Sequence, residues 1–204
     1  MTVFTSEERL LWGALDVPML GLTKDWHGEA VEPAAGWCLV ADPERLWFVA
    51  HHARPAELHP AARPGVFQAD LWKADCAELF ISHPASGRYM EFNLSPNGAW
   101  WCGEFKAPRE MAEGGDVPML DVATFADMDG DGAWLAALAL PLDLLQARVG
   151  FGEESGVNVT MVLNSPEQRF LTAADLGGGE PDFHRPARFP GVVYSPLAKV
   201  RGIV

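Results

Sequence analysis

Three polar side chains, those of Glu78, Glu91 and Asn93, occur in two short segments rich in β-forming residues. Side chains alternate between the two faces of a strand, so residues two apart share a face. If Ser82 pairs with Tyr89 in a hairpin, Glu78 lies opposite Asn93, about 5 Å away at Cβ, and Glu91 lies beside them on the same face. The spacing therefore predicts a polar hairpin face that gathers two carboxylates and an amide, with apolar core on the opposite face.

Tryptophan side chains accompany this polar face, and the chain holds eight of them against two tyrosines. Adjacent strand residues point to opposite faces, so one of Trp100 and Trp101 joins the polar face, and Trp72 is expected at its rim. A sugar stacks its apolar C–H face on an indole ring, and its hydroxyl groups need hydrogen-bond donors and acceptors. The pattern indicates a carbohydrate-binding platform. The alternative is a half-solvated sheet face on which Trp fills a second core.

Strands must position these side chains. Short β-rich segments separated by Pro, Gly and Asp recur at residues 37–40, 46–50, 76–82, 89–95, 100–105, 134–140, 157–163 and 189–194. Strands of this length predict an all-β fold, either an antiparallel sandwich or a barrel. Short helices are expected at residues 7–15, with Ser6 as N-cap, and at residues 141–148, where Pro suits the first turn. The acidic segment 109–132 is expected to be a loop region.

Length, charge and cysteine content restrict the class of protein. The 204 residues suit a single domain over residues 1–204. A net charge of −13 repels nucleic acid and anionic membrane surfaces, so neither is an expected partner. The first twenty residues lack a cationic segment followed by an apolar run, so no secretory signal is predicted and we expect a cytoplasmic protein. Three cysteines without a C-x-x-C pair argue against a disulfide framework or a zinc ribbon.

Both segments of the predicted hairpin resemble a known family. Residues 72–81 (WKADCAELFI) are similar to the W-x-x-D-x-x-E segment of family 9 carbohydrate-binding modules. Residues 89–98 (YMEFNLSPNG) resemble the YxEFNxSPxG stretch of bacterial DOMON-like proteins, the wider group that includes these modules. Later segments at residues 134–142, 158–160 and 181–186 are also similar to that group. The resemblance covers residues 37–194 and implies a β-sandwich of jelly-roll type, a non-catalytic role and a sugar-like ligand.

The resemblance also implies roles for individual residues. Trp72 matches a ligand-stacking Trp of the sugar-binding members, and Glu78 matches a polar contact to the sugar. A second stacking Trp of those members falls at residues 170–171, where this chain has Phe170 and no Trp. Phe170 is therefore the candidate for the second face of the ring. His184 belongs to a segment typical of the group and is expected either to hold the loop that closes the site or to touch the ligand.

One segment has the spacing of a metal site. Asp127, Asp129 and Asp131 alternate as in the first half of an EF-hand calcium loop, but Leu138 occupies the position of its bidentate Glu. The segment is either a calcium site or a solvated turn rich in Asp and Gly. No other cofactor is predicted, since nucleotide-binding and zinc-protease motifs do not occur.

Two other functions compete with sugar binding. Glu78 and Glu91 on one face could serve as the acid/base pair of a glycoside hydrolase. Some DOMON relatives hold haem between Met and Lys or His, but Met90 falls on the predicted core face and neither Lys73 nor a His can be placed opposite it.

The resulting hypothesis is a non-enzymatic β-sandwich of jelly-roll type, with one or two short helices, that binds a carbohydrate or a similar polyhydroxylated molecule. The alternative is a structural or interaction protein that keeps the scaffold without a sugar site. The candidate carbohydrate-binding residues are Trp72, Glu78, Glu91, Asn93, Trp101, Phe170 and His184.

Overall fold

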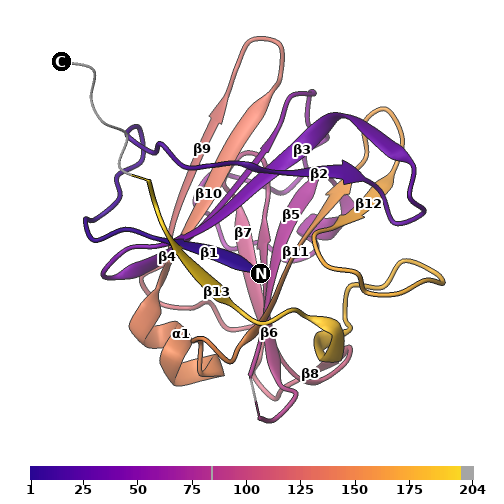
Figure 1. Cartoon of the computed structure of the whole chain (residues 1–204). Helices are drawn as coiled ribbons and strands as arrows, with labels where there is room; N and C mark the ends of the chain where they lie inside the picture. Colours follow the sequence, from indigo (N-terminus) through magenta and orange to yellow (C-terminus); the bar gives the residue numbers. More distant parts are fainter. Residues whose placement is uncertain (84, 199–204) are drawn as a thin grey trace.

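The computed structural model describes residues 1–83 and 85–198, and in this part of the chain it contains thirteen strands and one α-helix (Figure 1). The strands are β1 (Thr2–Thr5), β2 (Leu20–Lys24), β3 (Ala30–Ala41), β4 (Arg45–His52), β5 (Cys76–Ser82), β6 (Tyr89–Leu94), β7 (Trp100–Ala107), β8 (Glu110–Met111), β9 (Ala123–Met128), β10 (Trp134–Pro141), β11 (Gly156–Leu163), β12 (Arg169–Thr172) and β13 (Val193–Pro196). The helical elements are α1 (Leu142–Val149) and the 3₁₀ helices η1 (Leu71–Lys73) and η2 (Pro186–Arg188). The predicted all-β class is confirmed.

The described strands form two sheets. The first has the order β13-β1-β3-β4-β10-β9, with β2 paired to β3, and the second has the order β12-β11-β5-β6-β7-β8. Most neighbouring strands are antiparallel, as expected, but β1 runs parallel to both β3 and β13. These parallel pairs arise because β1 and β13, from opposite ends of the chain, lie side by side at one edge of the first sheet (Figure 1).

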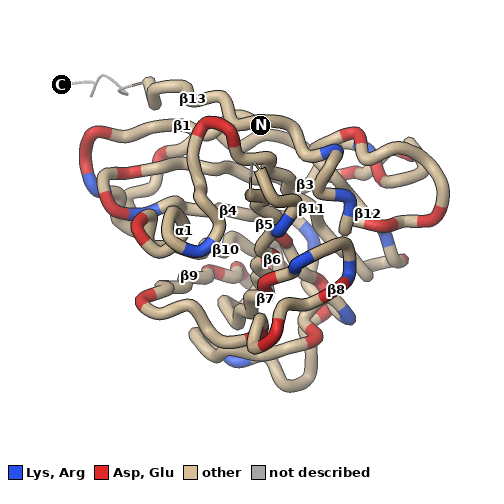
Figure 2. Tube along the Cα trace, turned by 90° about the horizontal axis from the view of Figure 1, so that it is seen from below, with Lys and Arg blue, Asp and Glu red and all other residues tan. Residues whose placement is uncertain are grey.

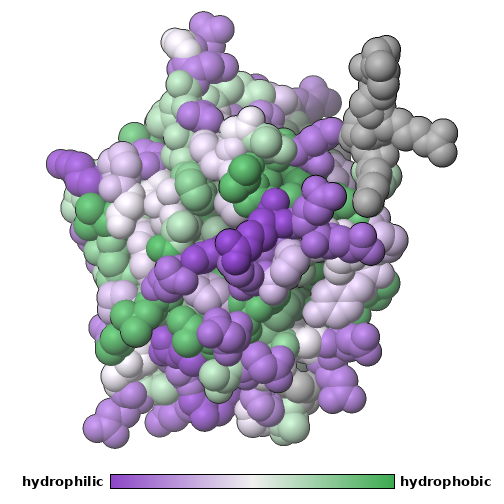
Figure 3. All heavy atoms as spheres, turned by 90° about the vertical axis from the view of Figure 1, so that its left-hand side faces the viewer, coloured by the Kyte–Doolittle hydropathy of each residue, from purple (hydrophilic) through white to green (hydrophobic). Residues whose placement is uncertain are grey.

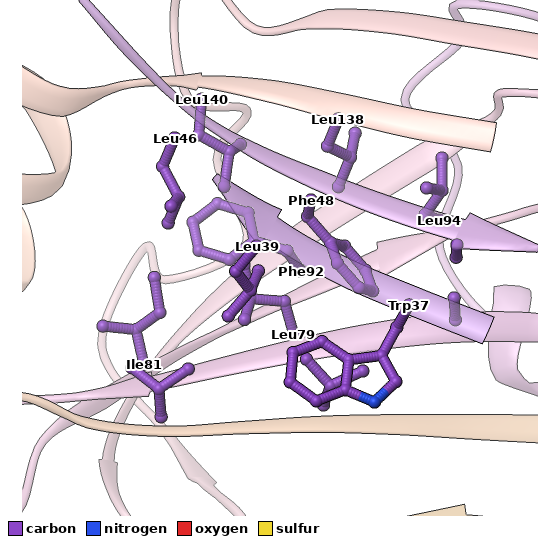
Figure 4. Packing of buried hydrophobic residues seen from close by; sticks show 14 of the residues in the cluster. Trp37, Leu39, Leu46, Phe48, Leu79, Ile81, Phe92, Leu94, Leu138 and Leu140 are labelled. Carbon is purple, nitrogen blue, oxygen red and sulfur yellow. The ribbon is translucent and has the colours of Figure 1, made fainter. Parts of the chain in front are cut away.

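The apolar faces of the two sheets pack together as the main core. Figure 4 shows Leu39 and Phe48 of the first sheet close to Leu79 and Phe92 of the second, and all four are inaccessible to solvent. Burial of each such side chain contributes about 1.5–3 kcal/mol to folding. This core holds the β5–β6 hairpin in place from one side, which leaves its other face available for a site.

The hairpin has the predicted register. Ser82 pairs with Tyr89, Glu78 lies opposite Asn93, and Glu91 lies two residues further along β6. In β7, Trp101 lies opposite Asn93 and shares its face, whereas Trp100 joins the core between the sheets. Alternation along the strands therefore placed Glu78, Glu91 and Asn93 correctly, and the structure shows that Trp101 is the Trp of β7 that joins them.

The outer face of the second sheet is not the half-solvated surface considered as the alternative, because side chains from other segments cover it. A separate apolar cluster packs on it and includes Leu71, Phe183 and Phe189 from segments outside the sheet. As a result Glu78, Glu91 and Asn93 are all nearly buried. The platform expected from alternation is the floor of an enclosed site.

The helix predicted at residues 7–15 is wrong, because the structure has no helix there. The hydroxyl of Ser6 donates to the carbonyl of Glu8 and accepts from its amide, which closes a local turn and leaves no helix cap. The following segment, residues 10–17, packs Leu10, Trp12 and Leu15 on the outer face of the first sheet. Tertiary packing of these side chains decides the irregular conformation.

Other differences concern edge strands. Segment 109–132, expected as loop, contains β8 and the six-residue β9, which pairs with β10. The strand predicted at residues 189–194 begins only at Val193, after η2. The short strands β1, β2 and β12 were not predicted, because they have too few residues to show a clear alternation of apolar and polar side chains. The helix predicted at residues 141–148 is confirmed as α1, which ends at Gly150 with a left-handed φ of 63°.

The surface is acidic and mixed. Figure 2 shows Asp and Glu on loops around the whole molecule. On the face in Figure 3, hydrophobic residues are interspersed with hydrophilic ones, so no continuous apolar surface forms there. Within the described residues, no helix has the length and apolar character that crossing a membrane requires.

Candidate functional site

A cleft of about 590 Å³ lies on the outer face of the second sheet. The structure brings all seven sequence-predicted residues to its lining: Trp72, Glu78, Glu91, Asn93, Trp101, Phe170 and His184. They come from η1, from strands β12, β5, β6 and β7 of the second sheet, and from the loop between β12 and η2. The remaining lining residues are Ala69, Asp70, Phe105, Arg109, Met111, Asp116, Val162, Pro181 and Phe183.

The floor of the cleft is a cross-strand row of polar side chains. Thr160 of β11, Glu78 of β5 and Asn93 of β6 are successive partners in the sheet. The Thr160 hydroxyl donates to Oε2 of Glu78 over 2.7 Å. The Asn93 amide forms a side-chain hydrogen bond with Glu91. These bonds hold both carboxylates on the floor of the cleft.

One floor atom lacks a partner. Asn93 is only 1% exposed, and its Oδ1 has no hydrogen-bond partner. An unsatisfied buried acceptor costs about 1–3 kcal/mol, so such atoms are uncommon in folded proteins. The Asn93 carbonyl is therefore a buried acceptor without a partner in a residue that lines the cleft.

The two floor carboxylates hold protons more tightly than ordinary Glu residues. Burial raises the pKa of Glu78 to about 7, against the effect of its Thr160 hydrogen bond. Burial and the nearby charge of Glu78 together raise the pKa of Glu91 to about 8. Desolvation and like-charge repulsion both disfavour the doubly ionised pair. The pair therefore takes up and releases protons near neutral pH.

The indole of Trp101 lies over the backbone of its own strand. Gly103, two residues along β7 on the same face, lies opposite Glu91. A Cβ at Gly103 would stand 2.2 Å from Cη2 of Trp101. The missing side chain at this position therefore makes room for the ring beside the polar floor.

A hydrogen-bonded chain forms one wall. The Arg109 amide donates to the hydroxyl of Tyr89 over 3.1 Å, and that hydroxyl lies 2.7 Å from Nδ1 of His184. All three groups are satisfied when Tyr89 donates to Nδ1, which places the imidazole proton on Nε2. Nε2 is 3.8 Å from Oε2 of Glu91. His184 thus both holds its loop and faces the cleft.

His184 is neutral. Burial and the charge of Arg109 lower its pKa to about 4. The Arg109 guanidinium itself binds Asp182 at 2.8 Å, and the Asp182 carboxylate also accepts from the backbone amide of His184. The wall therefore offers the cleft one neutral N–H donor.

Aromatic rings form the mouth and the opposite wall. Trp72 is 50% exposed, which is unusual for an indole, and Nζ of Lys73 lies over its ring at 5.5 Å from the centroid. Phe170 and Phe183 pack edge to face at 6.1 Å between ring centroids. Trp26, which the sequence left without a role, packs against Phe183 at 6.0 Å and donates from Nε1 to the carbonyl of Gly179. Trp26 thereby braces the loop that carries Phe183.

Sequence reasoning missed several lining residues. Phe105 follows Trp101 by four residues on the same strand face, so alternation could have identified it. Phe183 directly precedes His184 in the segment 181–186, which resembles the wider DOMON-like group. Arg109 and Asp116 had no such signal, because they lie in the turns that follow β7 and β8.

The alternative sites lie elsewhere. Asp129 accepts from the backbone amides of Asp131 and Ala133 in the β9–β10 turn. Among the described residues, no group of three or more His, Cys, Asp or Glu side chains is arranged to hold a metal ion. Met90 is fully buried between the sheets, and Lys73 forms an ion pair with Asp70.

No protein-family model matches this sequence, and no curated protein matches it. Solved structures share its fold. A protein from Bacteroides uniformis, described as a candidate carbohydrate-binding protein, has a TM-score of 0.71 at 15% identity, over 96% of this chain and 98% of its own.

A family 9 carbohydrate-binding module from Caldicellulosiruptor kristjanssonii is also similar. Its complex with glucose has a TM-score of 0.62 at 12% identity, over 98% of this chain and 97% of the module. Its complex with cellotriose has a TM-score of 0.61 at 13% identity, over 100% of this chain and 97% of the module. The chain therefore has the β-sandwich fold of family 9 carbohydrate-binding modules, as the resemblance implied.

Proposed function

We propose that this protein is a non-catalytic carbohydrate-binding protein and that the cleft on the second sheet holds the sugar. The observation that carries the proposal is a half-exposed indole, Trp72, beside a buried floor with an unpartnered acceptor, Asn93 Oδ1. A sugar ring needs this combination of an apolar surface and buried polar partners. The cleft volume of about 590 Å³ is that of a small-molecule site.

Each candidate residue has a role in this proposal. Trp72 stacks on one face of the ring, and Phe170 contacts the other. Glu78 and Asn93 hydrogen-bond hydroxyl groups, and Glu91 with the Nε2–H of His184 supplies further polar partners. Trp101 packs beside the floor as a second apolar surface. The fold shared with a module that was solved with glucose and cellotriose supports the assignment.

Catalysis is disfavoured by the placement of the two carboxylates. Glycoside hydrolysis requires two carboxyl groups that flank the scissile bond, about 5–9.5 Å apart. Glu78 and Glu91 both project from the same sheet face into the floor of the cleft, so a bound sugar has both on one side. This arrangement suits binding rather than hydrolysis.

Titration of intrinsic Trp fluorescence with a panel of mono- and oligosaccharides tests the proposal. We expect a saturable change in the native chain, loss of binding by at least about tenfold in Trp72→Ala through the lost stacking contact, and an unchanged affinity in Trp12→Phe. Trp12 is the matched control because it stacks on Phe125 on the outer face of the first sheet.

Two results would contradict the proposal. The native chain could fail to respond to every sugar, which would favour a scaffold without a sugar site. Alternatively, Trp72→Ala could bind as tightly as the native chain, which would place the ligand elsewhere. A Soret band in the purified protein would instead support the haem alternative.

A further inference from the structure

We propose that the sugar preferred by this cleft carries a protonated amino group. This inference rests on the proposed carbohydrate function and specifies its ligand class. It follows from three properties of the floor: a surplus of hydrogen-bond acceptors, two buried carboxylates without a cationic partner, and aromatic rings around them.

With Glu78 and Glu91 ionised, the floor offers acceptors and few donors. Glu78 has one oxygen bonded to Thr160, Glu91 has the Asn93 amide, and Oδ1 of Asn93 has no partner. The donor that faces them is Nε2–H of His184, at 3.8 Å from Glu91. An ammonium group has three donors and no acceptor, whereas a hydroxyl group brings an acceptor of its own. An ammonium therefore matches this floor better than a hydroxyl does.

In their ionised form the two buried carboxylates lack a counterion. Among the ion pairs of the described residues, neither Glu78 nor Glu91 has a Lys or Arg partner, since Arg109 is bound to Asp182. His184 is neutral and adds no charge. Removing a carboxylate from water is costly unless it is paired with a cation. A ligand ammonium would supply the missing positive charge.

The surroundings also favour a cation. Asp70 and Asp116 line the exposed rim, and the whole chain has a net charge of −13. Arg109 of the lining is paired with Asp182, and Asp70 is paired with Lys73, so Asp116 and the acidic excess of the chain supply the field that attracts a cation. Trp101 and Phe105 belong to the same lining, and aromatic rings attract cations.

Ligand binding is expected to change the protonation of the pair. At pH 6 both carboxylates are largely protonated, because burial raises the pKa of each above that value. An ammonium stabilises the ionised form, so its binding releases a proton to the buffer. The other ionisable groups next to the pair are His184, Tyr89, Cys76 and Arg109. Of these, Tyr89 and Cys76 have raised pKa values and stay protonated at pH 6, and His184 stays neutral.

Isothermal titration calorimetry of the full chain at pH 6 tests the inference, with D-glucosamine, D-glucose and N-acetyl-D-glucosamine as probes. N-acetylation keeps the nitrogen but removes the charge. We expect glucosamine to bind about tenfold tighter than the two neutral sugars, because charge-assisted hydrogen bonds are the stronger ones. Comparison of buffers with different ionisation enthalpies should show release of about one proton with glucosamine and none with glucose.

Matched variants assign the effect to the floor. Glu78→Gln and Glu91→Gln should each reduce the preference for glucosamine over glucose to about twofold or less, since each removes one carboxylate at constant size. Glu153→Gln, an exposed residue outside the cleft, should retain the preference. Circular dichroism checks that each variant is folded.

The outcomes separate the two proposals. Equal or tighter binding of glucose overturns the amino-sugar inference and leaves the carbohydrate function standing. Absence of binding by all three sugars overturns both. Choline, a quaternary ammonium without N–H donors, should bind at least about tenfold more weakly than glucosamine, because it cannot satisfy Asn93. Equal binding of choline would show a general cation cage and would also overturn the inference.

Discussion

The outer faces of the two sheets carry similar side chains, but the segments that cover them pack differently. Each face has Trp and Phe rings and a buried carboxylate. On the first sheet, Trp47 and Trp12 each stack on Phe125 with a centroid distance of 5.4 Å, and the N-terminal segment that carries Trp12 packs on this face. On the second sheet, the covering loops leave a cleft of about 590 Å³ above Glu78 and Glu91.

The buried carboxylates show the difference most clearly. Asp42 accepts four hydrogen bonds, from the backbone amides of Leu10, Glu44 and Arg45 and from Nε1 of Trp47. Burial alone would raise the pKa of Asp42, but these bonds favour the ionised form and lower it. Glu91 has fewer partners and a like charge nearby, and its pKa is raised. A fully bonded carboxylate stabilises the fold, whereas one left short of partners is available for a ligand.

The largest predicted effect is on the first sheet. Asp42→Ala should lower the free energy of unfolding by about 3 kcal/mol, because it leaves Trp47 Nε1 and three backbone amides without their acceptor. Chemical denaturation measures this loss. Sugar affinity in the folded protein should stay within about twofold of the native value, as measured by fluorescence titration. A stability change below about 0.5 kcal/mol would contradict the structural role given to Asp42.

The second prediction concerns pH. Because the pKa of Glu91 is raised from its ordinary value of 4.5 to about 8, the folded state binds its proton more tightly than the unfolded state does. Above about pH 6.5, where His184 is neutral in both the folded and the unfolded state, the free energy of unfolding should therefore fall as pH rises to 8, by on the order of 1–2 kcal/mol. Asp42, with a lowered pKa, should lose its contribution only as pH falls below 3.8.

Glu91→Gln isolates the Glu91 contribution. The variant should be more stable than the native chain at pH 8 by about 1 kcal/mol and should have a flatter stability profile between pH 5 and 8. Urea denaturation at a series of pH values provides the measurement. A native profile that rises between about pH 6.5 and 8 would show that the floor carboxylates are not desolvated as described.

The third prediction concerns the position of Trp101. Gly103→Ala places a Cβ where the indole now lies, 2.2 Å from Cη2, so the ring must move from the floor. We expect sugar affinity to weaken by about tenfold, measured by calorimetry. Gly130→Ala, at an exposed turn with open space around the position, is the control and should not change affinity. Unchanged affinity in Gly103→Ala would remove Trp101 from the site.

The smallest predicted effect comes from the wall. Tyr89→Phe removes the hydroxyl between the Arg109 amide and Nδ1 of His184 and should cost about 1 kcal/mol of stability. The imidazole is then no longer held in one tautomer, so the NMR signals of His184 should show a mixture of the two. A single, unchanged tautomer would contradict the proton arrangement inferred for this wall.

The β5–β6–β7 part of the site was predictable because the relevant interactions are local. Alternation along a strand and pairing across a tight hairpin fix which side chains share a face, so Glu78, Glu91 and Asn93 could be grouped from spacing alone, with one of Trp100 and Trp101 beside them. The same reasoning separated Trp100 from Trp101. The resemblance to a known family added Trp72, Phe170 and His184, which come from outside this hairpin, and the structure brings them to the same cleft.

Which segments pack on the outer face of each sheet was decided only by the tertiary structure. Residues 7–15 have a helix-like start, yet contacts with Trp47 and Phe125 of distant strands determine their path. Likewise, the burial of Glu78 and Glu91, their raised pKa values and the orphaned Asn93 carbonyl depend on loops that are far away in the sequence. Strand periodicity is a property of neighbouring residues. Desolvation depends on every group packed around an atom, and only the folded chain brings those groups together.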